Sequence, residues 1–138
     1  MTQQPLAPAV TADIALHCDD ELGRPMAFIA TFSYDALDPY AVRVTFHVPA
    51  GDIPWVVARS LLTRGLGEPV GEGDIRLRPG LDEDGRAVVR MDFHSPEGRL
   101  QVEVRTADLL AFLGRTWLAV HPGDERVNVD ALLDALLA

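Results

Sequence analysis

Apolar and polar residues alternate in three stretches of the first half of the chain. Nearly every second position is apolar over residues 10–18, 26–34 and 42–48, a period that is typical of half-buried β-strands. Turn-forming and polar residues separate these stretches. We therefore predict three consecutive antiparallel strands, with one apolar face that covers a core.

The next segment combines a proline with an apolar stripe at helical spacing. Pro54 suits the first position of a helix, where a missing N–H costs least. The inward stripe consists of Ala58, Leu61 and Leu62. Because Gly65 suits the left-handed conformation that often ends a helix, we predict a helix over residues 54–64.

Three further strands follow, and their apolar positions predict how they pair. A three-residue loop at residues 83–85, with Gly85 left-handed, is a favoured hairpin connection. It sets Leu77 opposite Met91 and keeps the apolar side chains on one face. A two-residue turn would place Arg78 opposite Met91 instead, so we reject it.

A second hairpin follows at residues 95–98, where proline and glycine occupy positions that favour a type I turn. The shared apolar face then sets Val102 opposite Met91. On the outer face, the same register sets Arg90 opposite Glu103.

Two helices are predicted near the end of the chain. Thr106 is suited to cap a helix that runs to about Val120. Phe112 and Leu118 lie outside the main apolar stripe of this helix, which indicates a second covering surface, such as another subunit. A last helix from Asn128 repeats apolar residues at helical spacing and is too short to persist without docking.

These elements predict an α+β fold of two antiparallel β-sheets with flanking helices, in the order βββ-α-βββ-α-α. The chain has 138 residues, 48% of them hydrophobic, which is enough for one core. Residues 1–8 lack periodicity and contain two prolines, so we expect a flexible tail. Residues 9–138 would form a single domain.

The composition restricts the partners and the compartment. The net charge is −9, from 21 acidic residues and 12 cations that are all arginine, and this sign disfavours phosphate backbones and anionic membranes. No apolar run approaches the roughly 18 residues of a membrane span, and the N-terminus lacks the pattern of a secretory signal. We expect a cytoplasmic protein without membrane insertion.

No pattern of residues predicts catalysis, a metal site or a cofactor. The four histidines lack ligand partners at suitable spacing, and the adjacent His17 and Cys18 point to opposite faces of a strand. The acidic residues 82–84 are too few for a calcium loop. The glycines of residues 65–73 lack the Lys and Ser/Thr of a phosphate loop.

Single-stranded nucleic-acid binding is the alternative function to weigh. The outer face of the central hairpin carries the arginines Arg76, Arg78, Arg86 and Arg90. The same face, with the next strand, carries the acidic residues Asp74, Asp92 and Glu103. This mixed charge is unlike the basic stripe expected of a nucleic-acid surface, and we expect no nucleic acid as a partner.

Five segments, in this order, resemble the SsgA-like proteins, which control sporulation-specific cell division in filamentous actinobacteria. They are residues 34–42 (YDALDPYAV), 55–66 (WVVARSLLTRGL), 71–75 (GEGDI), 95–98 (SPEG) and 129–133 (VDALL). The resemblance implies a whirly-like fold that assembles as a trimer and has no catalytic activity. It also implies a place at division septa, with FtsZ or other SsgA-like proteins as partners. The SsgB-like branch of the family helps to bring FtsZ to future septa.

Two sets of residues are candidates for contacts. The candidates for partner binding are Asp38, Tyr40, Trp55 and Arg59. For Asp38 and Tyr40 we favour a rigid turn over direct contact, and core packing explains Trp55 at least as well as an interface does. The candidates for an interface between subunits are Phe112, Leu118, Leu133 and Leu137, because apolar side chains of marginal helices need a docking surface.

Overall fold

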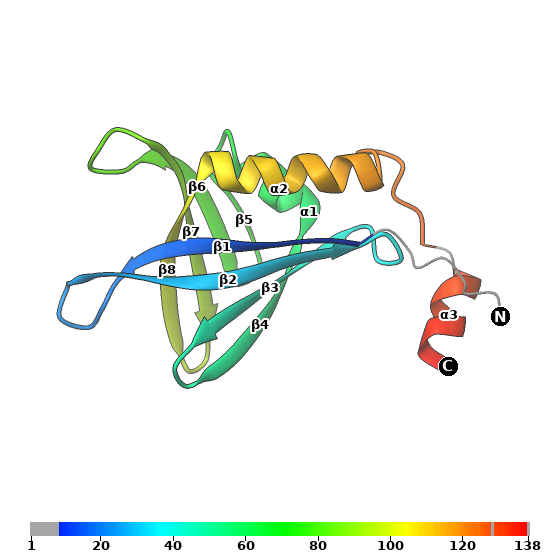
Figure 1. Ribbon diagram of the computed structural model, residues 1–138, viewed down its shortest axis with the longest axis horizontal. Helices are drawn as coiled ribbons and strands as arrows, with labels where there is room; N and C mark the ends of the chain where they lie inside the picture. The colour runs from blue at the N-terminus through cyan, green and yellow to red at the C-terminus, as the bar shows by residue number, and fades with distance from the viewer. Residues whose placement is uncertain (1–8, 128, 138) are drawn as a thin grey trace.

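A computed structural model describes residues 9–127 and 129–137, and the tail expected over residues 1–8 lies outside this part. The strands are β1 (Ala9–Asp19), β2 (Pro25–Asp35), β3 (Ala41–Val48), β4 (Gly51–Ala58), β5 (Val70–Glu72), β6 (Ile75–Leu81), β7 (Ala87–Ser95) and β8 (Gly98–Arg105). The helices are α1 (Arg59–Gly65), α2 (Thr106–Ala119) and α3 (Val129–Leu137). Figure 1 shows their arrangement.

The predicted N-terminal meander is confirmed. β1 pairs with β2 over its full length, and β2 pairs with β3, both in antiparallel register. The alternating apolar residues of these strands face the core, where Leu16, Phe32 and Phe46 are completely buried. The alternation does not predict burial at the β1–β2 turn, because Met26 beside that turn is exposed.

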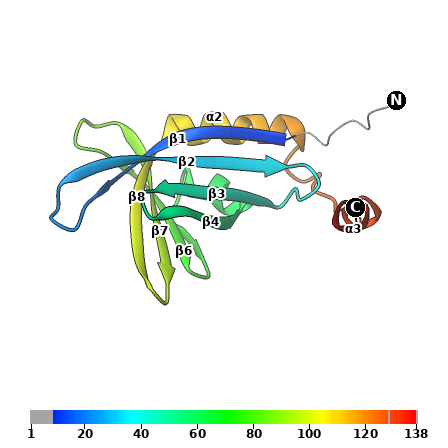
Figure 2. The ribbon, with the colours of Figure 1, turned by 60° about the horizontal axis from the view of Figure 1, so that its bottom comes forward.

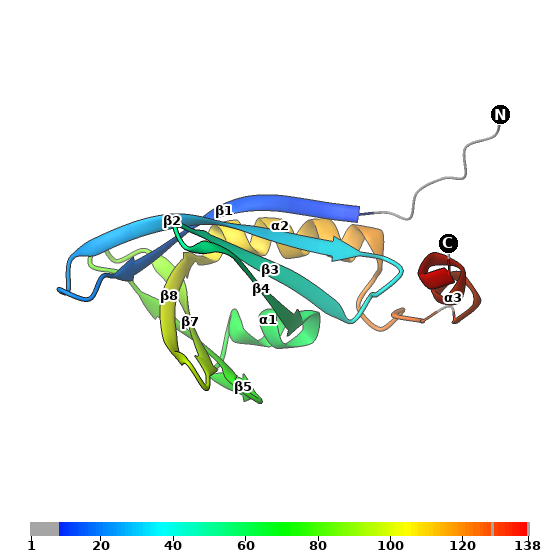
Figure 3. The same ribbon diagram turned by 90° about the horizontal axis from the view of Figure 1, so that it is seen from below.

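The prediction of two separate sheets was wrong, because all eight strands belong to one curled sheet in the order β4-β3-β2-β1-β8-β7-β6-β5. A short pairing between β1 and β8, at Leu16↔Val104 and His17↔Glu103, joins the two halves. The sheet curls so that the halves enclose the core (Figures 2 and 3). The ring of Phe93 in β7 lies 5.1 Å from that of Phe46 in β3, which shows that the halves face one another.

The helix predicted over residues 54–64 is helical only in its second half, and its first half is a strand. Residues 51–58 form β4, which pairs with β3 along its whole length, and α1 begins only at Arg59. Pro54 is accommodated because β4 lies at an edge of the sheet, where a missing N–H need not interrupt a ladder. The predicted element order is corrected accordingly, with β4 before α1 and the short β5 after it.

Gly65 has a different role from the predicted left-handed cap. It lies within α1 and is not among the glycines with positive φ. A Cβ atom at this position would lie 2.9 Å from Cβ of Leu77, closer than packed carbons approach. Gly65 therefore lets α1 pack closely against β6.

Both predicted hairpins of the second half are confirmed in register. Leu77 lies opposite Met91, and Arg90 lies opposite Glu103. Gly85 has φ +79°, as the predicted three-residue loop requires. Alternation and turn chemistry were sufficient to predict the register because the two strands of each hairpin are adjacent in sequence.

Helix α2 packs its apolar side against the inner face of the sheet (Figure 3). It begins after Arg105, and Thr106 makes no side-chain capping bond, so the predicted cap was wrong. Phe112 is 1% exposed and packs edge-on against Phe32 at 5.6 Å. The assignment of Phe112 to a subunit interface is therefore corrected: the curled sheet within the same chain covers it.

Helix α3 lies beyond the end of α2 and apart from the sheet (Figure 1). The side chains of Val129, Leu136 and Leu137 are exposed, and Leu133 is half exposed. The prediction of a short final helix is confirmed, and the described part of the chain leaves much of its apolar surface uncovered.

Candidate functional site

The residues singled out for partner contact gather around the start of α1. Arg59 is 3% exposed, and its Nη1 donates hydrogen bonds to the carbonyl oxygens of Thr116 (3.1 Å) and Val120 (2.7 Å) at the end of α2. Its Nη2 donates to Oε1 of Glu125 at 2.6 Å. The guanidinium also lies 4.9 Å from the ring centroid of Tyr34. Arg59 thus ties β2, α1, α2 and the segment after α2 together.

The loop between β2 and β3 is held by the same group of residues. The Tyr34 hydroxyl donates to the carbonyl oxygen of Pro39 at 2.9 Å. The backbone N–H of Arg59 donates to the carbonyl oxygen of Tyr40 at 2.8 Å. The Tyr40 hydroxyl donates to the carbonyl oxygen of Glu125 at 2.9 Å. We call Tyr34, Tyr40, Arg59 and Glu125 the Arg59 cluster.

Charge and burial shift two ionisation equilibria in the cluster. The hydrogen bond from Arg59 is the main cause that lowers the pKa of Glu125, and backbone bonds add to it. Burial is the main cause that raises the pKa of Tyr34, although the nearby Arg59 opposes this shift. The cluster therefore holds a carboxylate, a guanidinium and a neutral phenol, which suits a structural joint.

The four candidates for partner contact occupy different environments. Arg59 is buried and fully engaged, and Trp55 is partly buried with its ring 5.1 Å from that of Phe93. Tyr40 is 54% exposed, and Asp38 is exposed at the surface of the same loop. Tyr40 and Asp38 are thus presented to solvent on a loop that the Arg59 cluster makes rigid.

Asp35, rather than Asp38, supplies the side chain that stabilises this loop. Its Oδ1 accepts the backbone N–H of Leu37 at 2.9 Å. Sequence reasoning missed Glu125 as well, because it lies in a segment without periodicity and 66 residues from Arg59. No local pattern in the sequence points to that partner.

Three of the four interface candidates are at the surface. Leu118 is 89% exposed on the side of α2 that faces away from the sheet. Leu133 is 47% exposed and Leu137 82% exposed on α3. Phe112, the fourth, is buried as described above.

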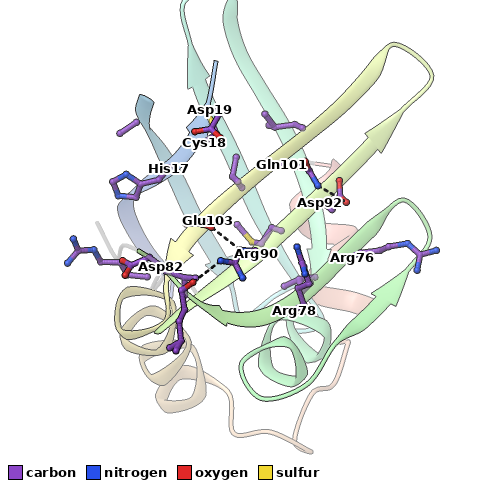
Figure 4. A pocket seen from close by; sticks show the side chains of 18 of the residues that line it. His17, Cys18, Asp19, Arg76, Arg78, Asp82, Arg90, Asp92, Gln101 and Glu103 are labelled. Atoms are coloured by element: carbon purple, nitrogen blue, oxygen red, sulfur yellow. Dashed lines mark hydrogen bonds and ion pairs between the residues drawn. The ribbon is translucent and has the colours of Figure 1, made fainter. Parts of the chain in front are cut away.

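A broad, open hollow of about 1520 Å³ lies along the outer face of β6, β7 and β8 and reaches the β1–β2 hairpin (Figure 4). Its labelled side chains are mostly charged. Arg90 Nε donates to Oε1 of Glu103 at 2.9 Å, and Arg99 Nε donates to Oδ1 of Asp92 at 2.8 Å. The bonds from Arg99 are the main cause that lowers the pKa of Asp92.

A chain of polar side chains crosses the outer face of the other half of the sheet. His47 Nδ1 lies 2.8 Å from Oδ1 of Asp52, and His47 Nε2 lies 2.7 Å from Oγ1 of Thr31. The order carboxylate, imidazole, hydroxyl is that of a hydrolytic triad. The Thr31 hydroxyl, however, donates its single proton to Oδ1 of Asp13 at 2.6 Å. The imidazole therefore does not receive that proton, and the arrangement serves to link four strands.

Three further features bear on function, namely a metal site, a membrane-spanning helix and a reactive thiol. Among residues 9–127 and 129–137, no group of three or more His, Cys, Asp or Glu side chains is arranged to hold a metal ion. None of the helices within that part of the chain combines the length and apolar character needed to cross a bilayer. Burial is the main cause that raises the pKa of Cys18, which disfavours the reactive thiolate.

Comparison with known proteins bears on this geometry. The family model described as "Streptomyces sporulation and cell division protein, SsgA" matches residues 28–125, which include all of the Arg59 cluster. The sporulation-specific cell division protein SsgB of Streptomyces coelicolor is 44% identical over 102 residues, covering 73% of this chain and 74% of the relative. The SsgB protein of Frankia casuarinae is 37% identical over 131 residues, covering 94% of this chain and 90% of the relative.

Two solved structures share the fold. An SsgA-like sporulation-specific cell division protein from Thermobifida fusca superposes with a TM-score of 0.83 at 31% identity, covering 96% of this chain and 98% of the other. A structure from a study of SsgB in Streptomyces coelicolor gives 0.82 at 36% identity, covering 89% and 97%. The similarity therefore extends over nearly the whole chain in sequence and in fold.

Proposed function

Because the chain belongs to the SsgA family of sporulation and cell division proteins, we propose that it is a non-enzymatic adaptor that brings FtsZ to future division septa. The observation that carries this proposal is the similarity to SsgB proteins over almost the whole chain. The SsgB-like branch is the part of the family for which FtsZ recruitment is the expected role. The protein would act in the cytoplasm, at the septum.

The surface near the Arg59 cluster suits a contact with a partner protein. Tyr40 is half exposed, and Asp38 lies close to it on a loop held by hydrogen bonds at its base and tip. A rigid loop loses little conformational entropy on binding. An exposed Tyr is also among the residue types that contribute most to interfaces.

Co-sedimentation of the purified protein with FtsZ filaments from the same organism tests the proposal. We expect the unmutated protein to sediment with the filaments and a Tyr40→Ala/Asp38→Ala variant to sediment less. Glu21→Ala/Leu22→Ala, which removes one acidic and one large exposed side chain at the β1–β2 turn, is the matched control and should behave as the unmutated protein. The absence of co-sedimentation by the unmutated protein would contradict FtsZ recruitment.

Binding of single-stranded nucleic acid, the alternative, has less support. The hollow is a broad charged concavity, yet it is lined by no Phe, Tyr or Trp on which bases could stack. The net charge of −9 also opposes a phosphate backbone. A mobility shift with single-stranded DNA that weakens as salt increases would revive this alternative.

We further propose that the protein forms a homo-oligomer, a trimer by the family resemblance, through α3 and the outer side of α2. Leu118, Leu136 and Leu137 are each more than 70% exposed, so a second copy that covers them would remove a large apolar area from water. Light scattering is the test, with an expected mass well above 15.0 kDa. Leu133→Ser/Leu137→Ser should lower the oligomer fraction, and a mass of one chain for the unmutated protein would refute the proposal.

A further inference from the structure

Two arginines on β6 stand out within the hollow. Arg76 and Arg78 are both exposed and project from the same face of the strand, two positions apart. Neither makes an ion pair with any residue in the described part of the chain. Other exposed arginines, such as Arg43 and Arg105, also make no ion pair within the described residues, but Arg76 and Arg78 concentrate two cations on one face of one strand.

The register places Arg78 in an unfavourable position. It lies directly opposite Arg90 across the β6–β7 pair, and like charges in opposite positions destabilise a sheet. The residue opposite Arg78 therefore offers it a second cation rather than a carboxylate.

The carboxylates of this face do not neutralise the two arginines. Glu103 is engaged by Arg90 (Figure 4), and Asp92 is engaged by Arg99. Asp92 lies directly opposite Arg76, yet its oxygens are bonded by Arg99 and Gln101 from β8. Of the three acidic residues that made this face look mixed in the sequence, Glu103 and Asp92 are thus already paired, whereas the side chain of Asp74 makes no ion pair within the described residues.

Arg90 is also held away from Arg78. Its Nη2 donates to the carbonyl oxygen of Leu81 at 2.8 Å, so its guanidinium lies directly over Gly80. A Cβ atom on Gly80 would lie 2.1 Å from Nη1 of Arg90. Gly80 therefore provides the space in which Arg90 rests, and Arg76 and Arg78 remain free beside it.

We propose that Arg76 and Arg78 form a docking surface for an extended acidic segment of a protein partner, with carboxylates at alternate positions. Residues two apart on a strand are separated by about 6.6 Å, which is also the spacing of alternate side chains in an extended peptide. Each guanidinium can take one carboxylate in a charge-assisted, bidentate contact. This inference rests on the proposed adaptor function and names the chemistry that its partner would present.

The surroundings favour peptide carboxylates over a nucleic acid. The hollow also contains Asp19 at the β1–β2 hairpin and Asp82, Glu83 and Asp84 at the β6–β7 loop. These acidic residues at its rim would repel any long anionic chain, and a nucleic acid carries a phosphate at every nucleotide. A short segment with only a few carboxylates could lie along β6 between them. Arg76 and Arg78 together suit a contact with only a few residues of a partner.

Fluorescence anisotropy with a short labelled peptide in which Glu alternates with Ser tests the proposal on the full chain. We expect binding at low salt that weakens toward about 0.15 M, where charges are screened over about 8 Å. Arg76→Ser/Arg78→Ser should raise the Kd about tenfold, as the loss of two surface ion pairs implies. Arg43→Ser/Arg64→Ser makes the same charge change at exposed positions outside the hollow and should leave the Kd within about twofold.

The outcomes separate this inference from the adaptor proposal. If the unmutated protein sediments with FtsZ but does not bind the Glu–Ser peptide, the docking surface is wrong and the adaptor function stands. If it binds the peptide through Arg76 and Arg78 but does not sediment with FtsZ, the surface stands and the partner is wrong. Equal loss of binding in both double variants would mean a response to net charge alone and would overturn the inference. Tighter, Arg76- and Arg78-dependent binding of a single-stranded oligothymidylate would also overturn it, in favour of nucleic acid.

Discussion

Arg59 and the Arg76–Arg78 pair use the same side chain in opposite ways. Arg59 is buried, and three oxygen atoms and an aromatic ring surround its guanidinium. Arg76 and Arg78 are exposed and unpaired within the described residues, and the sheet places Arg78 opposite another arginine. All twelve cations of the chain are arginine, so residue type alone does not separate a structural joint from a binding surface. What separates them is whether the fold satisfies the charge internally.

Of the variants at the two sites, replacement of Arg59 should lower the free energy of unfolding most. Arg59→Met removes the guanidinium and leaves Glu125 and two carbonyl oxygens at the end of α2 without their partner. We expect the free energy of unfolding to fall by about 2–4 kcal/mol, measured by urea denaturation.

Two matched variants sharpen this prediction. Arg43→Met, at an exposed position on β3, should change the free energy of unfolding by no more than about 0.5 kcal/mol. Arg59→Lys should restore only part of the loss, because an ammonium group cannot reproduce the planar set of donors that reaches three oxygens. Full stability of Arg59→Met would show that the cluster is not a structural joint.

Removal of a single hydroxyl from the cluster should have a smaller effect. Tyr34→Phe loses the hydrogen bond to the carbonyl oxygen of Pro39 and keeps the ring beneath Arg59. We expect a loss of about 1 kcal/mol in urea denaturation. Tyr40→Phe, whose ring is half exposed, is the matched control. It should cost less, because water can replace the bond to the carbonyl oxygen of Glu125.

The sequence predicted the second half of the sheet better than it predicted the Arg59 cluster. Alternation and turn residues were enough to place Leu77 opposite Met91 and Arg90 opposite Glu103, because these partners are joined by short hairpins. The pairing of β1 with β8 involves only two residue pairs from distant parts of the chain. Alternation shows which face of a strand is buried and does not show which strand lies beside it, so one curled sheet was predicted as two.

The same limit applies to the candidate residues. Arg59 was identified as a candidate for its residue type and its position near a helix start, but its partner Glu125 lies in a segment without periodicity. The position of Arg78 opposite Arg90 follows from the register that the sequence predicts, whereas the placement of the Arg90 guanidinium over Gly80 does not. The pairing of Arg99 with Asp92, which leaves Arg76 free, depends on side-chain directions that no pattern of residue types shows.

Acid titration should distinguish the buried joint from exposed charges. Because Arg59 lowers the pKa of Glu125 in the folded protein, the folded state binds fewer protons than the unfolded state in acid. The stability that Glu125 contributes is present above its unfolded pKa of about 4.3 and is lost as the pH falls through the lower folded pKa.

Urea denaturation across this acidic range measures the effect. Glu125→Gln should be less stable than the unmutated protein at neutral pH and should lose less stability below about pH 4.3. Some decline should remain, because the pKa of Asp92 is also lowered. Parallel acid profiles for the two proteins would contradict the assigned role of Glu125.

A methyl group at Gly80 should disturb the exposed site only slightly. The Cβ atom of Gly80→Ala would collide with the end of the flexible Arg90 side chain, and that end can move. Arg90 would then lose its bond to the carbonyl oxygen of Leu81, at a cost of at most about 1 kcal/mol. Gly67→Ala, where nothing lies within 4 Å of the added atom, is the control in the same urea measurement. The larger loss should be at Gly80.

The smallest effect on stability is expected where the proposed effect on binding is largest. Arg76→Ser/Arg78→Ser removes two charges without a partner in the described residues, and one of them lies opposite another arginine, Arg90, in the register. We therefore expect the free energy of unfolding to stay within about 0.5 kcal/mol of the unmutated value, or to rise slightly. Urea denaturation measures this on the same preparation used for peptide binding. A loss as large as that of Arg59→Met would mean that these arginines also support the fold, and the contrast between the two sites would fail. Retained stability together with weakened peptide binding would instead assign the charge of β6 to recognition.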